Sequence, residues 1–513
     1  MTRSLGAIWL LPLALLGCRD DEPQAGNAER GARRSSGAEP SKPAHVSDSN
    51  LLKAVNVRLT RDPGLSTGHI AVTVRNGIVE LSGRVEDLLM KRRAVRVVEA
   101  IKGVLAVNDR LVFSAERRPE SEIAHNVRSA LQLNMGRTEL HVQARAGTVT
   151  LTGRVDSQQR RAFAERVAEG VVGVQEVQNG IELRPNIPAS DAELEASVKA
   201  RLRWDALVGD GLIQVVARNG RVTLRGRVKS VAERRRAAGD AWLPGVGHVS
   251  DAGLVVDWTM PEAELLKNKP RRASDGEIAN AIQQAAQCEA RDAKLHVDVH
   301  EAVATLSGSV PTYAARIAVK ALARQTFGVR HVEDRLTVEP TSTLSDHNAA
   351  SYVRSALRWD PYTDSQGIQV DAQGGRITLS GKVDTTFQRA QARHIAGSIR
   401  GVKDVADALQ VRRKDAAYFY SPYLVPYAPY WHAGDSAPSV ALRSDAQIAK
   451  DIRRHLTWSP FVDAAEVKVD VQSGRAILTG AVDSLSERSQ AASNAYAGGA
   501  VAVDNRLSVE SGS

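Results

Sequence analysis

Few residues in this 513-residue chain have the types and spacing that covalent or metal chemistry needs. The twelve histidines are scattered, the two cysteines form no Cys-x-x-Cys pair, and there is no glycine run typical of a phosphate loop. No strand-to-helix nucleophile elbow is recognisable either. The sequence therefore predicts a protein that is not an enzyme and that needs no cofactor and no metal.

Cys18 is the residue best placed for covalent modification. It follows an apolar stretch from Leu5 to Leu16 with Arg3 near the start, which predicts a signal peptide over residues 1–18 that is too short to span a bilayer. The run Leu15-Leu16-Gly17-Cys18 resembles the lipobox of bacterial lipoproteins, in which the cysteine becomes the lipidated N-terminus. The resemblance implies an exported, periplasmic protein anchored to the outer or inner membrane. The alternative is an ordinary signal peptide with an incidental cysteine.

The segment after Cys18 and the overall charge limit the range of partners. Residues 19–50 contain almost no large apolar side chain, which predicts a disordered tether. The formal net charge is +9, and an exported chain without a recognisable binding motif is not expected to bind nucleic acid. Cys288 is the second cysteine, so no intramolecular disulfide can form once Cys18 is lipidated.

One short pattern, Leu-x-Gly-x-Val at the end of a predicted strand, recurs six times in the chain. The anchoring glycines, interpreted as determinants of the fold, are Gly83, Gly153, Gly226, Gly308, Gly381 and Gly480. They stand 70, 73, 82, 73 and 99 residues apart, so each module has close to 70 residues and the two longer gaps contain insertions. A fixed period of this kind is the signature of a tandem array.

Within one module the pattern predicts helix, strand, strand, helix and strand. Asn76-Gly77 between alternating apolar residues is typical of a two-residue hairpin. An N-cap residue stands four positions after every anchoring glycine, and Ser230 with Glu233 matches a capping box. The predicted fold class is α+β, a tandem array of small two-layer sandwiches, each with a three-stranded sheet and two helices on one face.

The same signals divide the chain into segments. We expect a signal peptide at 1–18, a tether at 19–50, modules at 51–115, 119–185, 190–258, 274–340, 344–413 and 443–511, a linker at 259–273 and an aromatic, proline-rich insert at 414–440. The linker is interpreted as a plain hinge. Modules 3 and 4 are expected to be distorted or specialised copies, because Pro244 precedes a helix-ending glycine and Ala302 replaces a hairpin glycine.

The element order resembles that of the BON domain, named after bacterial osmotically inducible and nodulation proteins. The residues that carry the resemblance are the Asn-Gly hairpin, the strand from Val222 to Val228 and the Gly-Val-x-x-Val run from Gly401 to Val405. The resemblance covers nearly everything from about residue 51 to residue 509. It implies an envelope protein that binds phospholipid or other envelope surfaces and helps to maintain membrane integrity under osmotic stress. It implies no catalytic residue.

Basic side chains recur near the start of the second helix of each module. One stands eight positions after every anchoring glycine, namely Lys91, Arg161, Arg234, Arg316, Arg389 and Arg488. The candidate contacts for anionic lipid are Lys91, Arg92, Arg93, Arg161, Arg234, Arg235 and Arg236. Basic clusters attract anionic head groups. The alternative is that the aliphatic part of each basic side chain covers the sheet edge while its charged group bonds within the module. The constant register of these residues favours this alternative.

Aromatic residues suggest a second candidate surface. It lies in the insert and consists of Tyr418, Phe419, Tyr420, Tyr423, Tyr427, Tyr430 and Trp431. Neighbouring prolines favour an extended backbone, so these rings either staple modules 5 and 6 together or face a partner. Trp204, Trp359 and Trp458 follow the first helices of three modules and are interpreted as lids on their own module cores.

These observations predict a membrane-anchored, non-catalytic envelope protein. Its modules bind phospholipid or envelope surfaces and support envelope integrity or osmotic stress tolerance, with avidity raised by repetition. The expected partners are the membrane through lipidated Cys18, anionic phospholipid, and envelope proteins or peptidoglycan. The alternative is a periplasmic protein-interaction scaffold for a secretion or cell-wall assembly, with contacts through the aromatic insert or the module edges.

Overall fold

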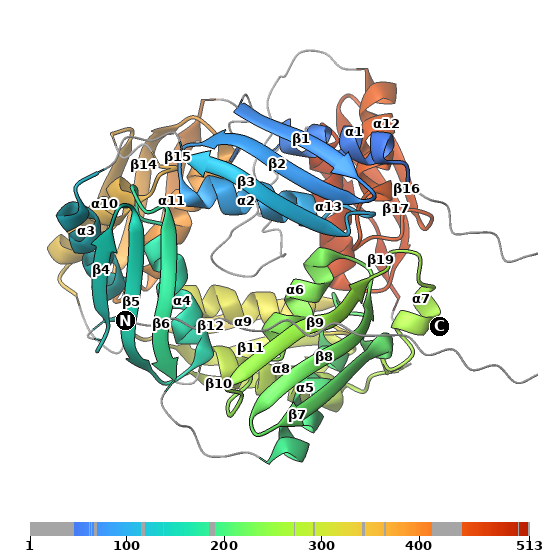
Figure 1. Cartoon of the computed structure of the whole chain (residues 1–513), viewed down its shortest axis with the longest axis horizontal. Helices are drawn as coiled ribbons and strands as arrows, with labels where there is room; N and C mark the ends of the chain where they lie inside the picture. The colour runs from blue at the N-terminus through green and yellow to red at the C-terminus, as the bar shows by residue number, and fades with distance from the viewer. Residues whose placement is uncertain are drawn as a thin grey trace, which may run out of the picture. The chain divides into compact units, whose positions relative to one another are not determined.

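Six copies of one small fold follow one another along the chain (Figure 1). The computed structural model describes residues 46–510 except 61, 63, 66–68, 114–117, 137, 184–189, 271, 291–292, 341–343, 364–365, 413–443 and 501. The described residues belong to one compact unit that begins at Val46. Cys18, the tether before Val46 and the aromatic insert with its seven candidate residues lie outside the described residues.

The first three modules share one element order. Module 1 contains α1 (Asp48–Thr60), β1 (Ile70–Arg75), β2 (Ile78–Val85), α2 (Leu88–Glu99) and β3 (Ala106–Phe113). Module 2 contains α3 (Glu120–Met135), β4 (His141–Arg145), β5 (Thr148–Val155), α4 (Gln158–Glu169) and β6 (Glu176–Leu183). Module 3 contains α5 (Asp191–Trp204), the 3-10 helix η2 (Asp210–Leu212), β7 (Ile213–Arg218), β8 (Arg221–Val228), α6 (Val231–Asp240) and β9 (His248–Val256).

The last three modules repeat this order after a linker that contains α7 (Glu262–Leu265). Module 4 contains α8 (Asp275–Glu289), β10 (Lys294–His300), β11 (Val303–Val310), α9 (Tyr313–Gln325) and β12 (His331–Val338). Module 5 contains α10 (Asp346–Trp359), β13 (Ile368–Gln373), β14 (Arg376–Val383), α11 (Thr386–Ser398) and β15 (Asp404–Val411). Module 6 contains α12 (Asp445–Thr457), β16 (Val467–Gln472), β17 (Arg475–Val482), α13 (Leu485–Ala497), β18 (Ala502–Asn505) and β19 (Ser508–Val509).

The second strand is central in every sheet. In module 1, Val79 of β2 lies opposite Val74 of the antiparallel β1 and opposite Val107 of the parallel β3. A parallel pair needs a crossover, which the second helix provides. Alternate residues of β2, such as Val79 and Leu81, are buried against both helices. The predicted α+β fold, a three-stranded sheet with two helices on one face, is confirmed.

The anchoring glycines lie where the second strand passes close to the backbone at the start of the first strand. Gly83 has φ +117°, and a Cβ added there would collide with the carbonyl oxygen of His69. Gly226 has φ +125° and would meet the carbonyl oxygen of Leu212 in the same way. The other four anchors share the positive φ and the backbone collision: Gly153, Gly308, Gly381 and Gly480. A side chain at these positions would push the strands apart.

A carboxylate at the start of the first helix holds the hairpin turn. In module 4, Asp275 accepts hydrogen bonds from the backbone N–H groups of Glu301 and Ala302 at 2.9 and 3.0 Å. Both turn residues have positive φ, +50° and +63°, although neither is glycine. Four other modules use the same contact through Asp48, Asp191, Asp346 and Asp445. The hairpin of module 4 is therefore undistorted, whereas β8 and β9 of module 3 shift register between Thr223 and Arg225.

The modules associate in nested pairs, 1 with 6, 2 with 5 and 3 with 4. One hydrogen bond between backbone groups joins each pair. The donor is an N–H group that follows the second helix of one module, and the acceptor is the carbonyl oxygen of a tryptophan at the end of the first helix of the other module. The donors and acceptors are Lys102 and Trp458 at 3.0 Å, Val172 and Trp359 at 2.9 Å, and Phe327 and Trp204 at 2.8 Å. Modules 6, 5 and 3 carry the tryptophan, and the first helices of their partners contain none.

Each of these tryptophans packs against the core of the partner module. Trp204 contacts the core of module 4, Trp359 that of module 2 and Trp458 that of module 1. The interpretation of the rings as lids on their own modules is therefore wrong. A domain of about 70 residues buries only about 60% of the surface that its unfolded chain exposes. The paired arrangement extends each small core with a ring from its neighbour.

The linker between modules 3 and 4 is not a plain hinge. Lys269 is buried, and its Nζ donates to the carbonyl oxygens of Leu202, Arg203 and Asp205 at 2.8, 2.8 and 2.7 Å. These carbonyls belong to the C-terminal end of α5, where carbonyl oxygens have no N–H donor within the helix. The ammonium group therefore caps α5 and fixes the linker to module 3.

Candidate functional site

The recurring basic residue of the second helix bonds to the third strand of its own module. Lys91, Arg161, Arg234, Arg316, Arg389 and Arg488 contact, in that order, Leu111, Asn179, Asp251, Asp334, Asp407 and Asn505. The distances run from 2.8 Å for Lys91 to 3.7 Å for Arg234. These contacts favour local bonding over the lipid contact predicted for Lys91, Arg161 and Arg234.

Two of the predicted lipid contacts are buried, and for them that prediction is wrong. Arg93 is 1% exposed, and its Nε lies 2.5 Å from Oδ1 of Asp62. Arg236 is 5% exposed, forms an ion pair with Asp205 and donates to Oε1 of Gln325 in module 4 at 2.7 Å. A buried guanidinium is tolerated only where a partner compensates its charge. Both residues therefore stabilise the array from inside.

Arg92 and Arg235 link different modules. Arg92 of module 1 lies 3.2 Å from Glu169 of module 2, and Arg235 of module 3 pairs with Glu99 of module 1. Both carboxylates are nearly buried, and burial raises the pKa of Glu169 although the charge of Arg92 opposes the shift. These arginines therefore neutralise acidic groups between modules, which leaves little of their charge for a lipid head group.

A set of arginines that sequence reasoning missed lies on the outer face of the module 3 sheet. Arg218 of β7 lies opposite Arg221 of β8, and Arg225 and Arg227 follow on β8 four and six residues after Arg221. All four are exposed, and we call them the outer arginine face. Alternate strand residues share a face. The sequence contains a signal for this face, because the arginines on both strands of the Asn219-Gly220 hairpin stand at positions that point to the same side of the sheet.

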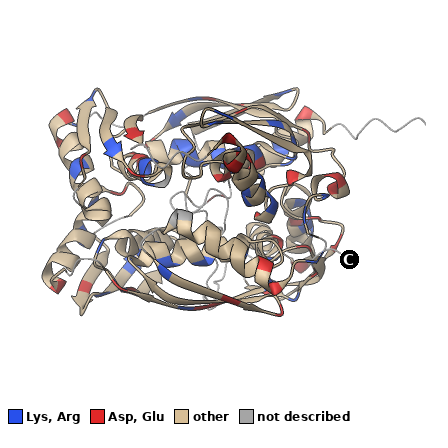
Figure 2. Ribbon diagram, turned by 90° about the horizontal axis from the view of Figure 1, so that it is seen from below, with Lys and Arg blue, Asp and Glu red and all other residues tan. Residues whose placement is uncertain are grey.

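The outer arginine face differs in charge from the outer faces of the other sheets. Elsewhere an acidic residue lies beside an arginine, as in Arg110–Glu80, Arg154–Glu182, Arg335–Glu333 and Arg376–Asp404. Among the described residues, Arg218, Arg221 and Arg225 have no acidic partner, and Arg227 lies 3.8 Å from Asp257. Basic and acidic residues are otherwise interspersed over helices and strands (Figure 2). The face is therefore a concentration of exposed, uncompensated positive charge.

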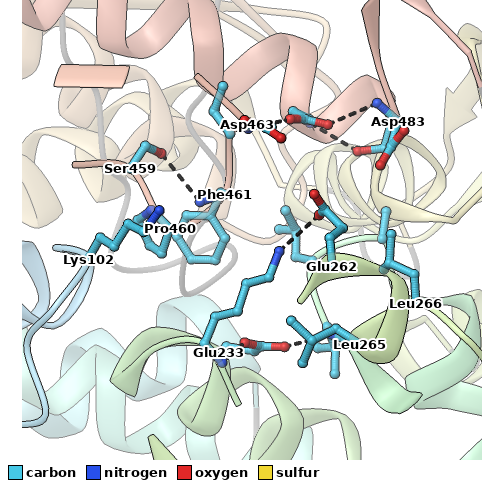
Figure 3. A pocket seen from close by; sticks show the side chains of 18 of the residues that line it. Lys102, Glu233, Glu262, Leu265, Leu266, Ser459, Pro460, Phe461, Asp463 and Asp483 are labelled. Carbon is cyan, nitrogen blue, oxygen red and sulfur yellow. Dashed lines mark hydrogen bonds and ion pairs between the residues drawn. The ribbon is translucent and has the colours of Figure 1, made fainter. Parts of the chain in front are cut away.

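A pocket of about 350 Å³ is lined mainly by modules 3 and 6 and by the linker (Figure 3). Glu233 and Glu487 occupy equivalent positions in its walls, near the starts of α6 and α13. Glu233 accepts from the backbone N–H groups of Gly209 and Lys229, both at 2.6 Å. The predicted capping box of Ser230 and Glu233 is not complete. Ser230 accepts from the backbone N–H of Glu233, but the Glu233 carboxylate accepts from the N–H of Lys229 and not from that of Ser230.

The acidic groups of this pocket hold protons more tightly than usual. Burial raises the pKa of Glu233, and it raises the pKa of Glu487 to about 7. Asp483, also in the wall, has a raised pKa for the same reason. Glu487 accepts from the backbone N–H groups of Asp463 and Asp483 at 2.8 and 2.9 Å. Both glutamates therefore serve as helix caps, and this use accounts for their burial without a catalytic role.

Two short sequence patterns have the spacing of known catalytic motifs, but they do not lie on the helices and strands that those motifs require. Gly64 to Gly68 reads Gly-x-Ser-x-Gly, yet it stands between α1 and β1, whereas a nucleophile elbow joins a strand to a helix. His296 and His300 are four residues apart on β10 and not on a helix, so their backbones are about 13 Å apart. In the described part of the chain no three His, Cys, Asp or Glu residues are grouped to hold a metal ion.

The predicted membrane anchor and the aromatic surface stay predictions. Cys18 and the residues from Tyr418 to Trp431 lie outside the described residues. Within the described ranges no helix is both long and apolar enough to cross a bilayer.

The repeated sandwich, its anchoring glycine and its helix caps define a class of small α+β module used in tandem. Residues 47–115, 119–185, 190–257, 274–340, 345–413 and 444–511 match the BON domain. Because these segments make up most of the sequence, the chain belongs to the BON domain family.

Two relatives share about a quarter of the chain with it. Osmotically-inducible protein Y of Escherichia coli (strain K12) is 27% identical over 148 residues, which cover 27% of this chain and 74% of that protein. Outer membrane lipoprotein DolP of Haemophilus influenzae is 27% identical over 132 residues, which cover 25% of this chain and 67% of that protein.

A likeness to a solved structure is weaker. The C-terminal domain of CdsD, a structural protein of the type III secretion system of Chlamydia trachomatis, is 15% identical with a TM-score of 0.12. The match covers 41% of this chain and 100% of that one. At this TM-score the likeness supports no inference about function.

Proposed function

We propose that this protein is a non-catalytic envelope protein whose array binds anionic phospholipid surfaces and supports envelope integrity or osmotic stress tolerance. Lipidated Cys18 holds it in the periplasm at a membrane. Membership of the BON family supports this proposal, as do the names of two relatives, one osmotically inducible and one an outer membrane lipoprotein. The observation that carries the lipid contact is the outer arginine face of module 3.

The outer arginine face suits a phosphate-bearing surface for three physical reasons. Guanidinium groups bind phosphate oxygens in a bidentate manner. Arg218, Arg221 and Arg225 have no acidic partner among the described residues, so no ion pair has to break before they bind. An arginine near an anionic membrane contributes about 1 kcal/mol, and several on one face add up. The chain between Cys18 and Val46, residues 19–45, would span about 90 Å at full stretch, which lets the face meet the membrane that holds Cys18.

Liposome co-sedimentation tests this proposal. A soluble form with residues 19–513 retains every described residue. It is mixed either with neutral vesicles or with anionic vesicles that contain phosphatidylglycerol, at low and at physiological salt. We expect salt-sensitive binding to anionic vesicles alone. The variant Arg218→Gln, Arg221→Gln, Arg225→Gln should bind at least tenfold more weakly, because about 1 kcal/mol is lost at each position. The control Arg154→Gln, Arg335→Gln, Arg376→Gln removes the same charge from ion-paired positions and should bind nearly as well as the parent.

Either of two results would contradict the lipid contact. Equal loss in the two triple variants would mean that net charge alone governs binding. No binding to any vesicle would leave Cys18 as the membrane contact and favour the periplasmic scaffold, for which pull-down with envelope extracts and peptidoglycan sedimentation are the corresponding assays.

A further inference from the structure

A buried aspartate follows the first helix in modules 1 and 3, and an arginine of the second helix bonds to it. Asp62 accepts from Nε of Arg93 at 2.5 Å, and Asp205 accepts from Nε of Arg236 at 2.6 Å. The two partners stand 31 residues apart in both modules. Burial alone would raise the pKa of Asp205, but the charge and the hydrogen bond of Arg236 lower it. The guanidinium group therefore permits an ionised carboxylate at this buried position.

Module 5 has the same buried aspartate without the arginine. Asp360 is 6% exposed, and 31 residues later Gln391 donates its Nε2 to the carboxylate at 2.8 Å. The backbone N–H groups of Tyr362 and Thr363 donate to it as well, both at 3.0 Å. These donors are neutral, so an ionised Asp360 would be a buried charge without a partner of opposite sign. Burial accordingly raises the pKa of Asp360 to about 7, although the hydrogen bond from Gln391 opposes the shift.

Asp360 lies beside a buried contact between modules 1 and 5. Phe387 of α11 lies under the guanidinium group of Arg93, with 4.4 Å between Cζ and the ring centroid, and Tyr362 meets the same ring edge-on at 4.8 Å. Two polar atoms here, Oη of Tyr362 and Oδ2 of Asp62, are buried and have no hydrogen-bond partner among the described residues. Burial of unpartnered polar atoms opposes a closed contact. Water could bond to both atoms if modules 1 and 5 moved apart.

The other titratable groups around Asp360 do not replace the missing arginine. Asp87 at the start of α2 has a charge of the same sign, which raises the pKa of Asp360 further. His394 of α11 is neutral near pH 7, because burial lowers its pKa to about 4. Tyr362 is neutral as well, because burial raises its pKa well above the usual value. Arg93 is bonded to the aspartate of its own module. Across the 2–5 pair, the residues of α3 and α4 that line the same small space are uncharged: Ala130, Asn134, Phe163 and Val167.

We propose that protonation of Asp360 operates a latch between modules 1 and 5. The latch is closed while the carboxyl group is neutral. It opens when the group ionises, because the buried charge then attracts water into the contact and repels Asp87. A carboxyl group that holds its proton more tightly in the closed state favours opening as the pH rises from about 4 to about 7. The latch acts on the closure of the array itself and does not rest on lipid binding.

The distance between modules 1 and 5 tests the latch directly. Spin labels are attached to Asn108→Cys on β3 and Gln369→Cys on β13, two exposed positions, in the soluble form of residues 19–513 with Cys288→Ser. Pulsed electron paramagnetic resonance then gives the distance distribution at pH 5.5 and at pH 8. We expect one distance at pH 5.5 and a second, longer one at pH 8. The ratio of open to closed chains should rise about thirtyfold, as a pKa of about 7 in the closed state and an ordinary one in the open state require.

Two variants separate Asp360 from other titrating groups. Asp360→Asn removes the titration, and Gln391→Arg supplies the base that modules 1 and 3 have at the same position. Both variants should keep at pH 8 the distance that the parent has at pH 5.5. The control Gln178→Arg adds the same charge at an exposed position of β6 and should respond to pH as the parent does. Circular dichroism checks that each variant is folded, and if Gln391→Arg does not fold, Asp360→Asn decides alone.

Identical distance distributions at the two pH values in the parent would overturn the proposal, as would an opening that persists in Asp360→Asn. Asp360→Asn should still sediment with anionic vesicles as the parent does. The failure of the latch can therefore be told apart from the failure of the lipid contact.

Discussion

The 2–5 and 3–4 interfaces use the same framework and differ in what fills it. Both have a tryptophan carbonyl that accepts a backbone N–H from the partner, and both place the indole against the partner core. Between modules 2 and 5 the remaining space is about 60 Å³, and between modules 3 and 4 it is about 560 Å³. A main-chain bond and one aromatic ring are therefore common to the two pairs. The other side chains at the interface can differ, and a larger space remains where they are small.

The filled interface also contains groups with shifted pKa values. Burial lowers the pKa of His394 to about 4, with the charge of Arg166 acting in the same direction. Burial raises the pKa of Asp360 to about 7, against the effect of its hydrogen bond from Gln391, while the charge of Asp87 raises it further. We therefore expect the stability of the 2–5 pair to change both toward acidic and toward neutral pH.

Removal of the two tryptophans should give the largest contrast. Trp359→Ala should cost about 3–5 kcal/mol of the free energy of unfolding, because the ring is packed against the core of module 2 in an interface with little empty space. Trp204→Ala should cost less, about 1–2 kcal/mol, because the ring already borders an open space. Urea unfolding, with hydrogen exchange to locate the loss, measures both. Equal costs would mean that the open cavity does not weaken the packing of Trp204.

Replacement of one alanine by leucine in each of the two interfaces should give the next largest contrast. Ala356 of α10 and Ala285 of α8 line the small and the large space respectively. Ala356→Leu should destabilise the chain by about 1–3 kcal/mol, since extra methylene groups have no room. Ala285→Leu should change stability by less than about 0.5 kcal/mol or increase it. Thermal unfolding of the two variants under one condition gives the comparison, and a larger loss in Ala285→Leu would show that the cavity is closed in solution.

The pH dependence should separate His394 from Asp360. A lowered histidine pKa means that the unfolded chain binds more protons, so this contribution to stability is lost as pH falls from about 6.5 to 4. A raised aspartate pKa has the opposite sign, so stability is lost as pH rises from about 4 to 7.

His394→Leu should therefore remove about 1–2 kcal/mol of the acid-side loss, and Asp360→Asn should remove a similar part of the loss toward neutral pH. In Asp360→Asn, the amide of Gln391 can turn over and accept, since its Oε1 has no partner among the described residues. Urea unfolding at pH 4.5, 6 and 7.5 provides the check. A parallel shift of all three values in either variant would rule out titration as the cause.

The fold of a module could be predicted because its signals are local. An anchoring glycine such as Gly83, an N-cap and a hairpin turn lie within about 20 residues of one another, and each has a direct stereochemical reason. The pairing could not be predicted in this way. Trp458 and the core that it covers are separated by more than 300 residues, and no local pattern says which neighbour a ring will meet.

The candidate site was predicted less well than the fold, for a geometric reason. Consecutive helix residues point about 100° apart, so a basic run divides among several faces. Arg92 lies at the surface while Arg93 is buried beside Asp62. A strand keeps every second residue on one side, so Arg221, Arg225 and Arg227 share a face even though they are interrupted by apolar residues. The constant register of Lys91 and its equivalents favours local bonding, and the structure has these bonds.

Nested pairing also sets an order for biogenesis. Modules 3 and 4 can pair as soon as both have emerged, but module 1 must wait for Trp458, which is synthesised near the end of the chain. Contacts between distant parts of a sequence form slowly, and exposed apolar surface makes such waiting states prone to aggregation. Modules 1 and 2 are thus the parts of the nascent protein with the longest unpaired lifetime. A chaperone would have its greatest effect on them.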